Sequence, residues 1–383
     1  MERAELIELV RATGCAEEHG GFVFLCDPKW GAAERAVVTA LQKSEIRNPK
    51  SEIAQGWLCV PTGGTSGGVR FARHDEHTLT AAIKGFCAHF GIERVNAVGV
   101  LPPHHVSGLM ARVRCAATGG EHIAWDWKRL EAGVWPARKD GDWVLSLVPT
   151  QLQRLLVSPV AVDWLRGFRV IFIGGGPVWP ELTEAASRAE LPISLSYGMT
   201  ETAAMVAALR PAEFLAGARS TGAAMPHARI SLTPDGIVTI CGDSVFRGYF
   251  PDERTSRVFE TEDLGQLDAQ GHLHLLGRRD AVIITGGKKV QPAEVEAALR
   301  ASDEFADVAV VGVPDAEWGE AVVACYLAGG AEPDLTRVAA ALESLAAFKR
   351  PKRYVAVADW PRTAQGKLNR AALAVAVRPS GER

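Results

Sequence analysis

Short apolar runs alternate with amphipathic stretches along the middle of the chain. The apolar runs predict buried strands at Trp57–Val60, Val95–Leu101, Trp143–Val148, Arg169–Ile173 and Ile193–Tyr197. The stretches between them predict helices at Glu76–Phe90, Val106–Ala117, Gln151–Val157 and Trp179–Ala189. Nearly continuous apolar strands that alternate with helices are typical of an α/β fold with a doubly wound, mostly parallel sheet. In such sheets, ligands are expected beyond the carboxyl ends of the strands.

The pattern changes twice in the last third of the chain. Short alternating runs with glycine turns predict a small antiparallel β subdomain from Arg229–Leu232, Gly236–Cys241, Gln266–Asp268 and His272–Leu276. A second α/β pattern follows, with strands at Val282–Thr285, Val308–Val313 and Val322–Leu327 and helices at Pro292–Arg300 and Leu335–Ala347. We therefore expect a large N-terminal domain over 1–278 and a small, mobile C-terminal α+β domain over 279–383. Residues 1–56 have helical patterning only at Ala4–Arg11 and Ala33–Lys43, and no role is assigned to them.

Composition narrows the class of protein. The chain has 383 residues, of which 47% are hydrophobic and 23% charged, as in globular proteins of roughly two or three domains. A net charge of −3 provides no basic surface for nucleic acid or an anionic membrane. Charged residues in Met1–Arg11 argue against a signal peptide, and no apolar run is long enough to span a bilayer. Seven scattered cysteines without a C-x-x-C pair predict reduced thiols in the cytoplasm, without a zinc site or disulfides.

The most distinctive loop contains only Gly, Thr and Ser. It follows the first predicted strand and comprises Thr62, Gly63, Gly64, Thr65, Ser66, Gly67 and Gly68. Glycines at this density let backbone N–H groups converge on an anion, and Arg70 adds a cation suited to phosphate. The P-loop motif of nucleotide triphosphatases fails, because Val69 and Arg70 stand where it requires Lys and Ser or Thr. A flexible surface turn is the alternative, and the loop alone does not decide between the two.

Two further loops follow predicted strands. His104 and His105 lie in a Pro-punctuated loop with no other metal ligand at suitable spacing. Spacing therefore favours a structural role, although one of the two could orient a substrate carboxylate. The second loop consists of Gly174, Gly175, Gly176 and Pro177. It would let a flat ligand lie against the backbone, but Trp179 prevents a complete G-x-G-x-x-G motif.

Polar residues near the end of the last predicted strand of the sheet are suited to a nucleotide. Tyr197, Gly198, Thr200 and Glu201 lie in one short segment, which supplies an aromatic face, a hydroxyl and a carboxylate. These groups can stack on a base, bond to phosphate and hold a magnesium ion. The alternative is a helix start that Thr200 caps.

Isolated polar residues in the second half of the chain give weaker signals. Asp263 and Arg278 could bind ribose hydroxyls, but exposed turn residues are the default interpretation. His272 and His274 would share one face of a strand, which without a third ligand is a weak metal signal. Lys367 follows a glycine in a Pro- and Thr-containing loop and could reach another domain's site. A lone loop lysine is more often a solubilising charge.

The order of these motifs resembles that of the AMP-forming adenylate-forming enzymes, which include acyl-CoA synthetases, luciferases and peptide-synthetase adenylation domains. The motifs are Pro61–Gly67, Tyr197–Thr202, Glu262–Gly265, Gly277–Asp280, Gly286-Gly287 before Pro292–Glu296, and Gly366-Lys367. More narrowly, four segments resemble the o-succinylbenzoate–CoA ligases of menaquinone and phylloquinone synthesis. These are Leu101–Met110, Thr118–Gly120, Ser146–Leu156 and Trp179–Leu182. The family is normally longer at its N-terminus.

The resemblance implies a role for each motif. Thr62 to Gly67 would bind phosphate, with Arg70 in place of the family's loop lysine. Gly174–Pro177 and Tyr197 would bracket adenine, Thr200 would contact the α-phosphate, Glu201 would hold Mg²⁺, and Asp263 and Arg278 would bind ribose. Asp280 would be the hinge, Gly286 and Gly287 would act in the CoA step, and Lys367 would stabilise charge during adenylation. His105 would line the acyl pocket, where Ser107, Arg112, Arg114, Thr150 and Gln151 are candidates for a second substrate carboxylate.

The resemblance also implies a reaction. ATP, Mg²⁺ and CoA would be required, and a carboxylic acid would be converted through an acyl-adenylate into a CoA thioester, with 2-succinylbenzoate as the expected acid. Another aromatic or fatty acid, and an enzyme that loads a carrier-protein thiol, remain open. A non-enzymatic AMP-binding module is the third alternative, against which the intact glycine loop, Glu201 and Lys367 argue. The chain is expected to be a monomer or a homodimer.

Overall fold

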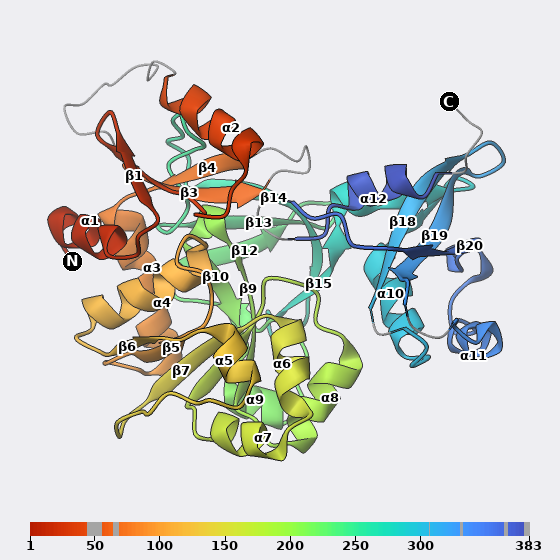
Figure 1. The fold of residues 1–383 in the computed structure, drawn as a ribbon, viewed down its shortest axis with the longest axis horizontal. Coiled ribbons are helices and arrows are strands. Elements are labelled where there is room, and N and C mark those ends of the chain that lie inside the picture. The colour runs from red at the N-terminus through yellow and green to blue at the C-terminus, as the bar shows by residue number, and fades with distance from the viewer. Residues whose placement is uncertain (44–55, 64–68, 306, 330–331, 364–366, 379–383) are drawn as a thin grey trace.

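The computed structural model describes residues 1–43, 56–63, 69–305, 307–329, 332–363 and 367–378. A seven-stranded sheet forms the centre of the N-terminal domain, in the order β11-β10-β9-β8-β7-β5-β6 (Figure 1). Its strands are β5 (Asn96–Gly99), β6 (His122–Ala124), β7 (Trp143–Leu147), β8 (Val170–Ile173), β9 (Ile193–Met199), β10 (Ala204–Ala208) and β11 (Ala223–Ala224). Strands β5 to β9 are mutually parallel, whereas β10 and β11 add antiparallel pairs at one edge. The predicted doubly wound sheet is confirmed.

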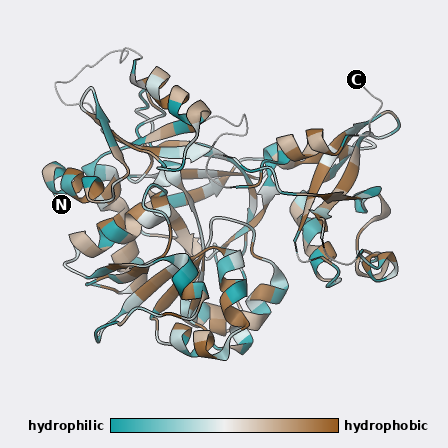
Figure 2. Cartoon of the chain, in the orientation of Figure 1, coloured by the Kyte–Doolittle hydropathy of each residue, from teal (hydrophilic) through white to brown (hydrophobic). Residues whose placement is uncertain are grey.

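Helices cover both faces of this sheet because its strands are apolar on both sides. In β8, Ile171 and Ile173 point into one core cluster and Val170 and Phe172 into another, as the two-residue period of a strand requires. The helices on the first face are α5 (Trp127–Glu131), α6 (Pro149–Leu156), α7 (Pro159–Arg166), α8 (Pro180–Arg188) and α9 (Pro211–Leu215). Those on the second face are α3 (Glu76–Phe90) and α4 (Val106–Ala117). Figure 2 shows the strands as largely apolar.

The first part of the chain builds a second sheet, for which the sequence had assigned no role. It contains β1 (Ala16–His19), β2 (Phe22–Leu25), β3 (Leu58–Gly63) and β4 (Val69–His74) in that order. The helix α1 (Arg3–Arg11) packs on α4, and α2 (Ala32–Gln42) lies against β4. The predicted strand at 57–60 therefore belongs to this sheet and not to the parallel one. Its neighbours β2 and β4 run parallel and antiparallel to it, respectively.

The predicted β subdomain is an antiparallel sheet of β12 (Ala228–Leu232), β13 (Ile237–Gly242), β14 (Val258–Leu267) and β15 (Leu273–Arg278). Strand β14 is longer than expected and contains Asp263, which pairs with Arg278 of β15. Asp263 is thus a half-buried strand residue and not part of an exposed turn, whereas Arg278 is the exposed last residue of β15. No group of three or more His, Cys, Asp or Glu side chains suited to a metal ion occurs among the described residues, so His272 and His274 gain no further ligand.

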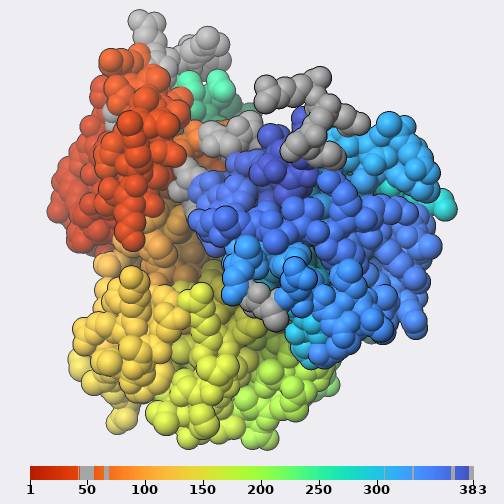
Figure 3. All heavy atoms as spheres, turned by 45° about the vertical axis from the view of Figure 1, so that its right-hand side comes forward, coloured from red at the N-terminus to blue at the C-terminus, as the bar shows by residue number. Residues whose placement is uncertain are grey.

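The C-terminal domain is a mixed sheet covered by helices. Its strands are β16 (Ile283–Thr285), β17 (Lys288–Val290), β18 (Val308–Asp315), β19 (Gly319–Leu327) and β20 (Arg353–Val357). Its helices are α10 (Pro292–Arg300), α11 (Leu335–Ala341) and α12 (Arg370–Ala376). Helix α11 ends six residues before the predicted end of its helix at Ala347, and a separate short turn covers Ala347–Lys349. In the space-filling view this domain, in blue, lies against the N-terminal domain (Figure 3). Across the described part of the chain, no helix is both long and apolar enough to cross a membrane.

Four histidines lie in apolar surroundings and make folding sensitive to acid. Burial lowers the pKa of His74, His105, His122 and His227 to about 4 each. Each imidazole is therefore neutral in the folded protein between about pH 4 and 6.5, but is protonated in the unfolded chain. The part of the free energy of unfolding that depends on these neutral imidazoles is fully present above about pH 6.5. It is lost as the pH falls towards 4.

We expect the free energy of unfolding to drop between pH 7 and 4.5 by on the order of 2 kcal/mol for each of the four histidines. Urea unfolding at several pH values measures this, and His74→Asn should flatten the dependence. His19 is exposed, so His19→Asn is the matched control and should leave the dependence unchanged. A free energy of unfolding that stays constant over this range would contradict the expectation.

Candidate active site

The glycine-rich segment connects two antiparallel strands. Strands β3 and β4 pair from Leu58↔His74 to Gly63↔Val69, so the segment is a hairpin connection and not a strand-to-helix loop. Gly64, Thr65, Ser66 and Gly67 lie outside the described residues, and their predicted phosphate contacts remain a prediction. Thr62 and Arg70 are described and stand opposite each other in the register. The hairpin therefore presents a hydroxyl and a cation side by side.

Glu201 is the polar centre next to this hairpin. Its residue is only 6% exposed, and its Oε1 atom accepts hydrogen bonds from Thr62 Oγ1 at 3.2 Å and from the Tyr249 hydroxyl at 2.8 Å. Burial and the Glu201 carboxylate raise the pKa of Tyr249, which keeps the phenol protonated as a donor. The Arg70 guanidinium lies 4.2 Å from the centroid of the Tyr249 ring. Sequence reasoning missed Tyr249, because it lies far along the chain from every other residue of this group.

A tight turn positions Thr200 and Glu201. The 3₁₀ turn η1 (Thr200–Thr202) joins β9 to β10, and a Cβ atom on Gly198 would lie 2.0 Å from the Ala204 carbonyl oxygen. Glycine is therefore required where the two strands cross so closely. The Nε2 atom of the neutral His74 ring contacts the Thr200 carbonyl oxygen at 2.7 Å. This contact holds the η1 turn against β4. Met199 and not Thr200 is the cap of η1, so the alternative capping role for Thr200 is wrong.

Tyr197, Asp263, Arg278 and Asp280 form a continuous polar chain. The Tyr197 hydroxyl donates to Asp263 Oδ2 at 2.7 Å, and burial together with Asp263 raises the pKa of this phenol. Arg278 contacts Asp263 Oδ1 at 3.4 Å and binds both carboxylate oxygens of Asp280 at 2.8 and 2.7 Å. The residues predicted for the base, the ribose and the hinge are therefore brought together in space.

The second glycine loop lies at the carboxyl end of β8. A Cβ atom on Gly174 would lie 3.0 Å from Ser196 Oγ, so this position packs against β9 beside Tyr197. Gly175, Gly176 and Pro177 are exposed. The loop therefore offers open backbone next to a buried aromatic residue, as the predicted adenine site requires.

His105 is the N-cap residue of α4, and its pKa responds to the charge of a lysine of the C-terminal domain. Its pKa falls to about 4, mainly through burial, and the charges of His104 and Lys367 lower it further. Lys367 of the C-terminal domain is therefore within electrostatic range of His105, although Lys367 is itself exposed. Behind it, His104 contacts Asp27 through Nε2 at 3.4 Å, so the first fifty residues of the chain help to hold the histidine pair.

The remaining candidates differ in how free their side chains are. Gln151 Oε1 accepts the Val148 N–H at 3.0 Å and so caps α6, whereas Thr150 is exposed and Ser107 half-buried. Arg114 is buried with its guanidinium 4.3 Å from the Phe86 ring centroid, and burial lowers its pKa to about 10. Its Nε and Nη2 atoms have no hydrogen-bond partner among the described residues. Arg112 is half-buried, and after burial its charge is the next largest cause of the lowered pKa of His122.

The predicted CoA-step glycines lie in the C-terminal domain. Gly286 and Gly287 form the turn between β16 and β17 with φ angles of 53° and 72°, which favour glycine. The Gly286 N–H donates to the Trp318 carbonyl oxygen at 2.8 Å. Lys367 is exposed, and its carbonyl oxygen accepts a hydrogen bond from the Thr363 N–H at 2.7 Å.

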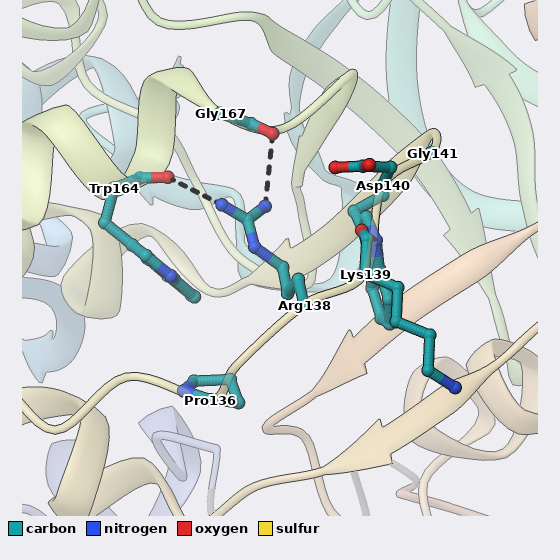
Figure 4. Close-up of a pocket in the computed structure, with 8 residues that line it drawn as sticks. Pro136, Arg138, Lys139, Asp140, Gly141, Trp164 and Gly167 are labelled. Carbon is teal, nitrogen blue, oxygen red and sulfur yellow. Dashed lines mark hydrogen bonds between the residues drawn. The ribbon is translucent and has the colours of Figure 1, made fainter.

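A separate surface pocket of about 400 Å³ contains none of these residues. Arg138, Lys139, Asp140 and Trp164 are among its lining residues (Figure 4). The Arg138 guanidinium donates hydrogen bonds to the carbonyl oxygens of Gly167 and Trp164, which also line the pocket. We do not assign the active site to it.

Two family models match the parts of the chain that carry this geometry. The model described as AMP-binding enzyme matches residues 19–250, and the model described as AMP-binding enzyme C-terminal domain matches residues 294–367. The chain belongs to the AMP-binding enzymes. Both the glycine-rich hairpin and Glu201 fall within the first match, and Lys367 is the last residue of the second.

Curated AMP-binding relatives include ligases for different acids. A 2-succinylbenzoate–CoA ligase of Enterococcus faecalis is 32% identical over 352 residues, which cover 86% of this chain and 71% of the relative. An indoleacetate–CoA ligase of Aromatoleum aromaticum is 31% identical over 346 residues, which cover 85% of this chain and 68% of the relative. The predicted resemblance to AMP-forming acid–thiol ligases is confirmed.

Solved AMP-binding structures have the same architecture. The o-succinylbenzoate CoA synthetase of Bacillus subtilis, in complex with its acyl-adenylate intermediate, superposes with a TM-score of 0.75 at 25% identity. This match covers 97% of the present chain and 81% of that one. The same enzyme in complex with ATP and magnesium gives a TM-score of 0.72 at 26% identity, covering 88% and 74% of the two chains. The predicted fold, with a large N-terminal and a small C-terminal domain, is confirmed.

Proposed function

We propose that the protein is an ATP-dependent CoA ligase that converts 2-succinylbenzoate to 2-succinylbenzoyl-CoA, a step of menaquinone or phylloquinone synthesis. The observation that carries this proposal is the hydrogen-bonded group of Thr62, Tyr249 and Glu201 beside Arg70, with Lys367 of the C-terminal domain within electrostatic range of His105. The first group would bind the phosphates of ATP, and His105 would line the acyl pocket. The similarity to 2-succinylbenzoate–CoA ligases supports the choice of acid.

The residues around Glu201 fit a magnesium ion. Both hydrogen bonds from Thr62 and Tyr249 reach Oε1, and among the described residues no hydrogen bond to Oε2 is observed. A carboxylate oxygen is the type of ligand that Mg²⁺ prefers, together with substrate phosphates and waters. Glu201 would therefore hold the ion, which when bound offsets negative charge on the phosphates of ATP.

The chain's own residues account for the first half-reaction. A carboxylate is a poor acyl donor because its leaving group would be oxide, so it must first be activated. One substrate carboxylate oxygen attacks the α-phosphorus of ATP, the bond to the bridging oxygen breaks, and pyrophosphate leaves. Lys367 and Arg70 would stabilise the negative charge on the reacting phosphates. Neutral His105 does not repel the lysine as an imidazolium would.

The second half-reaction would require a rearrangement. The C-terminal domain would turn about Asp280, remove Lys367 from the pocket and bring the Gly286-Gly287 turn to the site. The CoA thiolate then attacks the acyl carbon, the carbon–oxygen bond to AMP breaks, and AMP leaves. For the second carboxylate of 2-succinylbenzoate, we propose Arg112 and Arg114, since the latter is a buried cation with unpartnered nitrogens.

Selectivity among acids tests the proposal directly. Pyrophosphate release from ATP and Mg²⁺ is measured with 2-succinylbenzoate, benzoate, 4-hydroxybenzoate, indoleacetate and medium-chain fatty acids. We expect 2-succinylbenzoate to exceed the others by at least about a hundredfold in kcat/KM, because only it fills a pocket with an additional cation. Subsequent AMP release should require CoA and not a phosphopantetheine carrier protein.

Other outcomes would redirect the assignment. Preference for indoleacetate would retain the ligase and replace the acid, an alternative that the second relative supports. AMP release only with a carrier protein would reject the CoA step. No pyrophosphate with any acid would contradict the enzymatic proposal.

A further inference from the structure

Arg300 of α10 contacts the N-terminal domain through an aromatic ring. Its guanidinium carbon lies 5.5 Å from the centroid of Trp179, which is the N-cap residue of α8. A guanidinium within about 6 Å of a tryptophan face is attracted by the negative face of the ring. The contact therefore joins the two domains. In Figure 3 the blue C-terminal domain lies against the yellow-green part of the chain, which includes α8.

Arg300 is held in place before it meets the ring. Its Nη2 atom donates to the Val308 carbonyl oxygen at 2.9 Å and lies 3.9 Å from the carboxylate of buried Glu296. Asp307 lies 4.0 Å away on the same side. The side chain is only 20% exposed, so little rotamer freedom remains to be lost when the domains meet. Because the guanidinium is fixed relative to the C-terminal domain, a contact between Arg300 and Trp179 also constrains the position of that domain.

Trp179 is equally well anchored on its own side. It packs against the core cluster between the parallel sheet and helices α5–α9, and its carbonyl accepts the Thr183 N–H at 3.3 Å. Trp179 also lies two residues after Pro177, the end of the loop predicted to face adenine. The ring that Arg300 contacts therefore belongs to a residue close in sequence to the proposed nucleotide site.

In the same arrangement of the two domains, the charge of Lys367 is within electrostatic range of His105. The charge of Lys367 lowers the pKa of His105 in the same structure in which Arg300 covers Trp179. At the hinge side, Gln291 at the start of α10 lies against Gly277, where a Cβ atom would approach its Oε1 to 2.4 Å. Rotation about Asp280 would withdraw Lys367 and separate Arg300 from Trp179 at the same time.

We infer that Arg300 is a positioning residue that, through Trp179, holds the C-terminal domain in the arrangement for adenylate formation. This inference rests on the proposed function, because it assigns the contact to one of its two half-reactions. Loss of the contact lowers the population of that arrangement without removing any group that touches a substrate. Adenylate formation should therefore slow, whereas thioester formation from added acyl-adenylate should not.

The test is a double-mutant cycle on the two half-reactions. Arg300→Ala and Trp179→Ala should each slow pyrophosphate release by about three- to tenfold, the range expected for a cation–π contact. The double variant should be no slower than the slower single variant, because both remove the same interaction. CoA-dependent consumption of added acyl-adenylate should stay equal to wild type or rise. Arg300→Lys and Trp179→Phe, which keep a cation and a ring, should recover most of the rate.

Arg138 provides a matched control within one domain. It lies 5.1 Å from the Trp164 ring and 3.9 Å from the Phe168 ring, and none of the three is in the site (Figure 4). Arg138→Ala should leave the ratio of the two half-reactions unchanged. Parallel loss in both half-reactions for Arg300→Ala, or additive effects in the cycle, would overturn the inference.

A second readout separates this inference from the proposed function. Fluorophores are introduced at Arg188 and Glu343, which are exposed on α8 and on the C-terminal domain. Energy transfer between them should indicate a wider distribution of separations in Arg300→Ala and Trp179→Ala than in the wild type, with or without activity. An unchanged distribution would contradict the inference even if the wild type is a ligase. Absent pyrophosphate release with a changed distribution would reject the function alone.

Discussion

Replacing Lys367 by alanine is expected to slow acyl-adenylate formation by at least about a hundredfold. Lys367 is the cation of the C-terminal domain within electrostatic range of His105, and it would stabilise the negative charge that builds up on the phosphates as pyrophosphate leaves. Thioester formation from added acyl-adenylate should stay within about twofold of wild type, because the proposed rotation would have moved the lysine away before that step. Single-turnover pyrophosphate release and CoA-dependent AMP release measure the two steps separately.

Two variants make this prediction specific. Lys367→Arg keeps the charge with a different shape and should recover part of the first step. Lys128 is exposed on α5, and Lys128→Ala should leave both steps unchanged. Adenylate formation at the wild-type rate in Lys367→Ala, together with failed thioester formation, would show that the lysine has another role.

Replacing Glu201 by glutamine is expected to lower kcat/KM for MgATP by about a hundredfold or more. Glutamine keeps the shape of the side chain and can still accept the hydrogen bonds from Thr62 and Tyr249, but it lacks the charge that attracts Mg²⁺. The Mg²⁺ concentration for half-maximal rate should rise in parallel. The protein should remain folded, since the substitution removes a buried charge and leaves no new one.

Tyr249→Phe is the matched control for Glu201. It removes one hydrogen bond to the carboxylate but keeps the ring under Arg70. We expect a loss of about ten- to a hundredfold, which is the usual size of one hydrogen bond to a charged group. An unchanged Mg²⁺ dependence in Glu201→Gln would remove this residue from the metal site.

Elements with local signals were predictable from the sequence. Helices α3 and α4 match their predicted bounds, and α3 begins after Asp75, whose side chain accepts the Thr78 N–H. By contrast, β2 is a four-residue strand whose parallel partner β3 begins 33 positions later, at Leu58. Nothing near Phe22 in the chain indicates this pairing. The position of a short strand is determined by the strands with which it pairs. The periodicity of its own few residues does not contain this information.

The residues of the candidate site also fall into those with a local sequence signal and those without one. Residues within one contiguous motif, such as Thr200 and Glu201, could be selected from the sequence, with phosphate and Mg²⁺ as their predicted ligands. Tyr249 and His74 were missed, although both contact that motif, because they come from distant parts of the chain. Sequence resemblance identifies residues that face a ligand more readily than residues that hold them in place.

The Arg278 guanidinium is shared by two carboxylates with different proposed tasks. It contacts Asp263, proposed for ribose, at 3.4 Å and binds Asp280, the proposed hinge, through two shorter hydrogen bonds. A nucleotide that forms hydrogen bonds with Asp263 or Arg278 must change the strength of the ion pair between Arg278 and Asp280. Thermodynamic reciprocity then requires domain rotation to change nucleotide affinity by the same factor. One side chain would thereby make the release of AMP and the return of the domain a single, linked equilibrium.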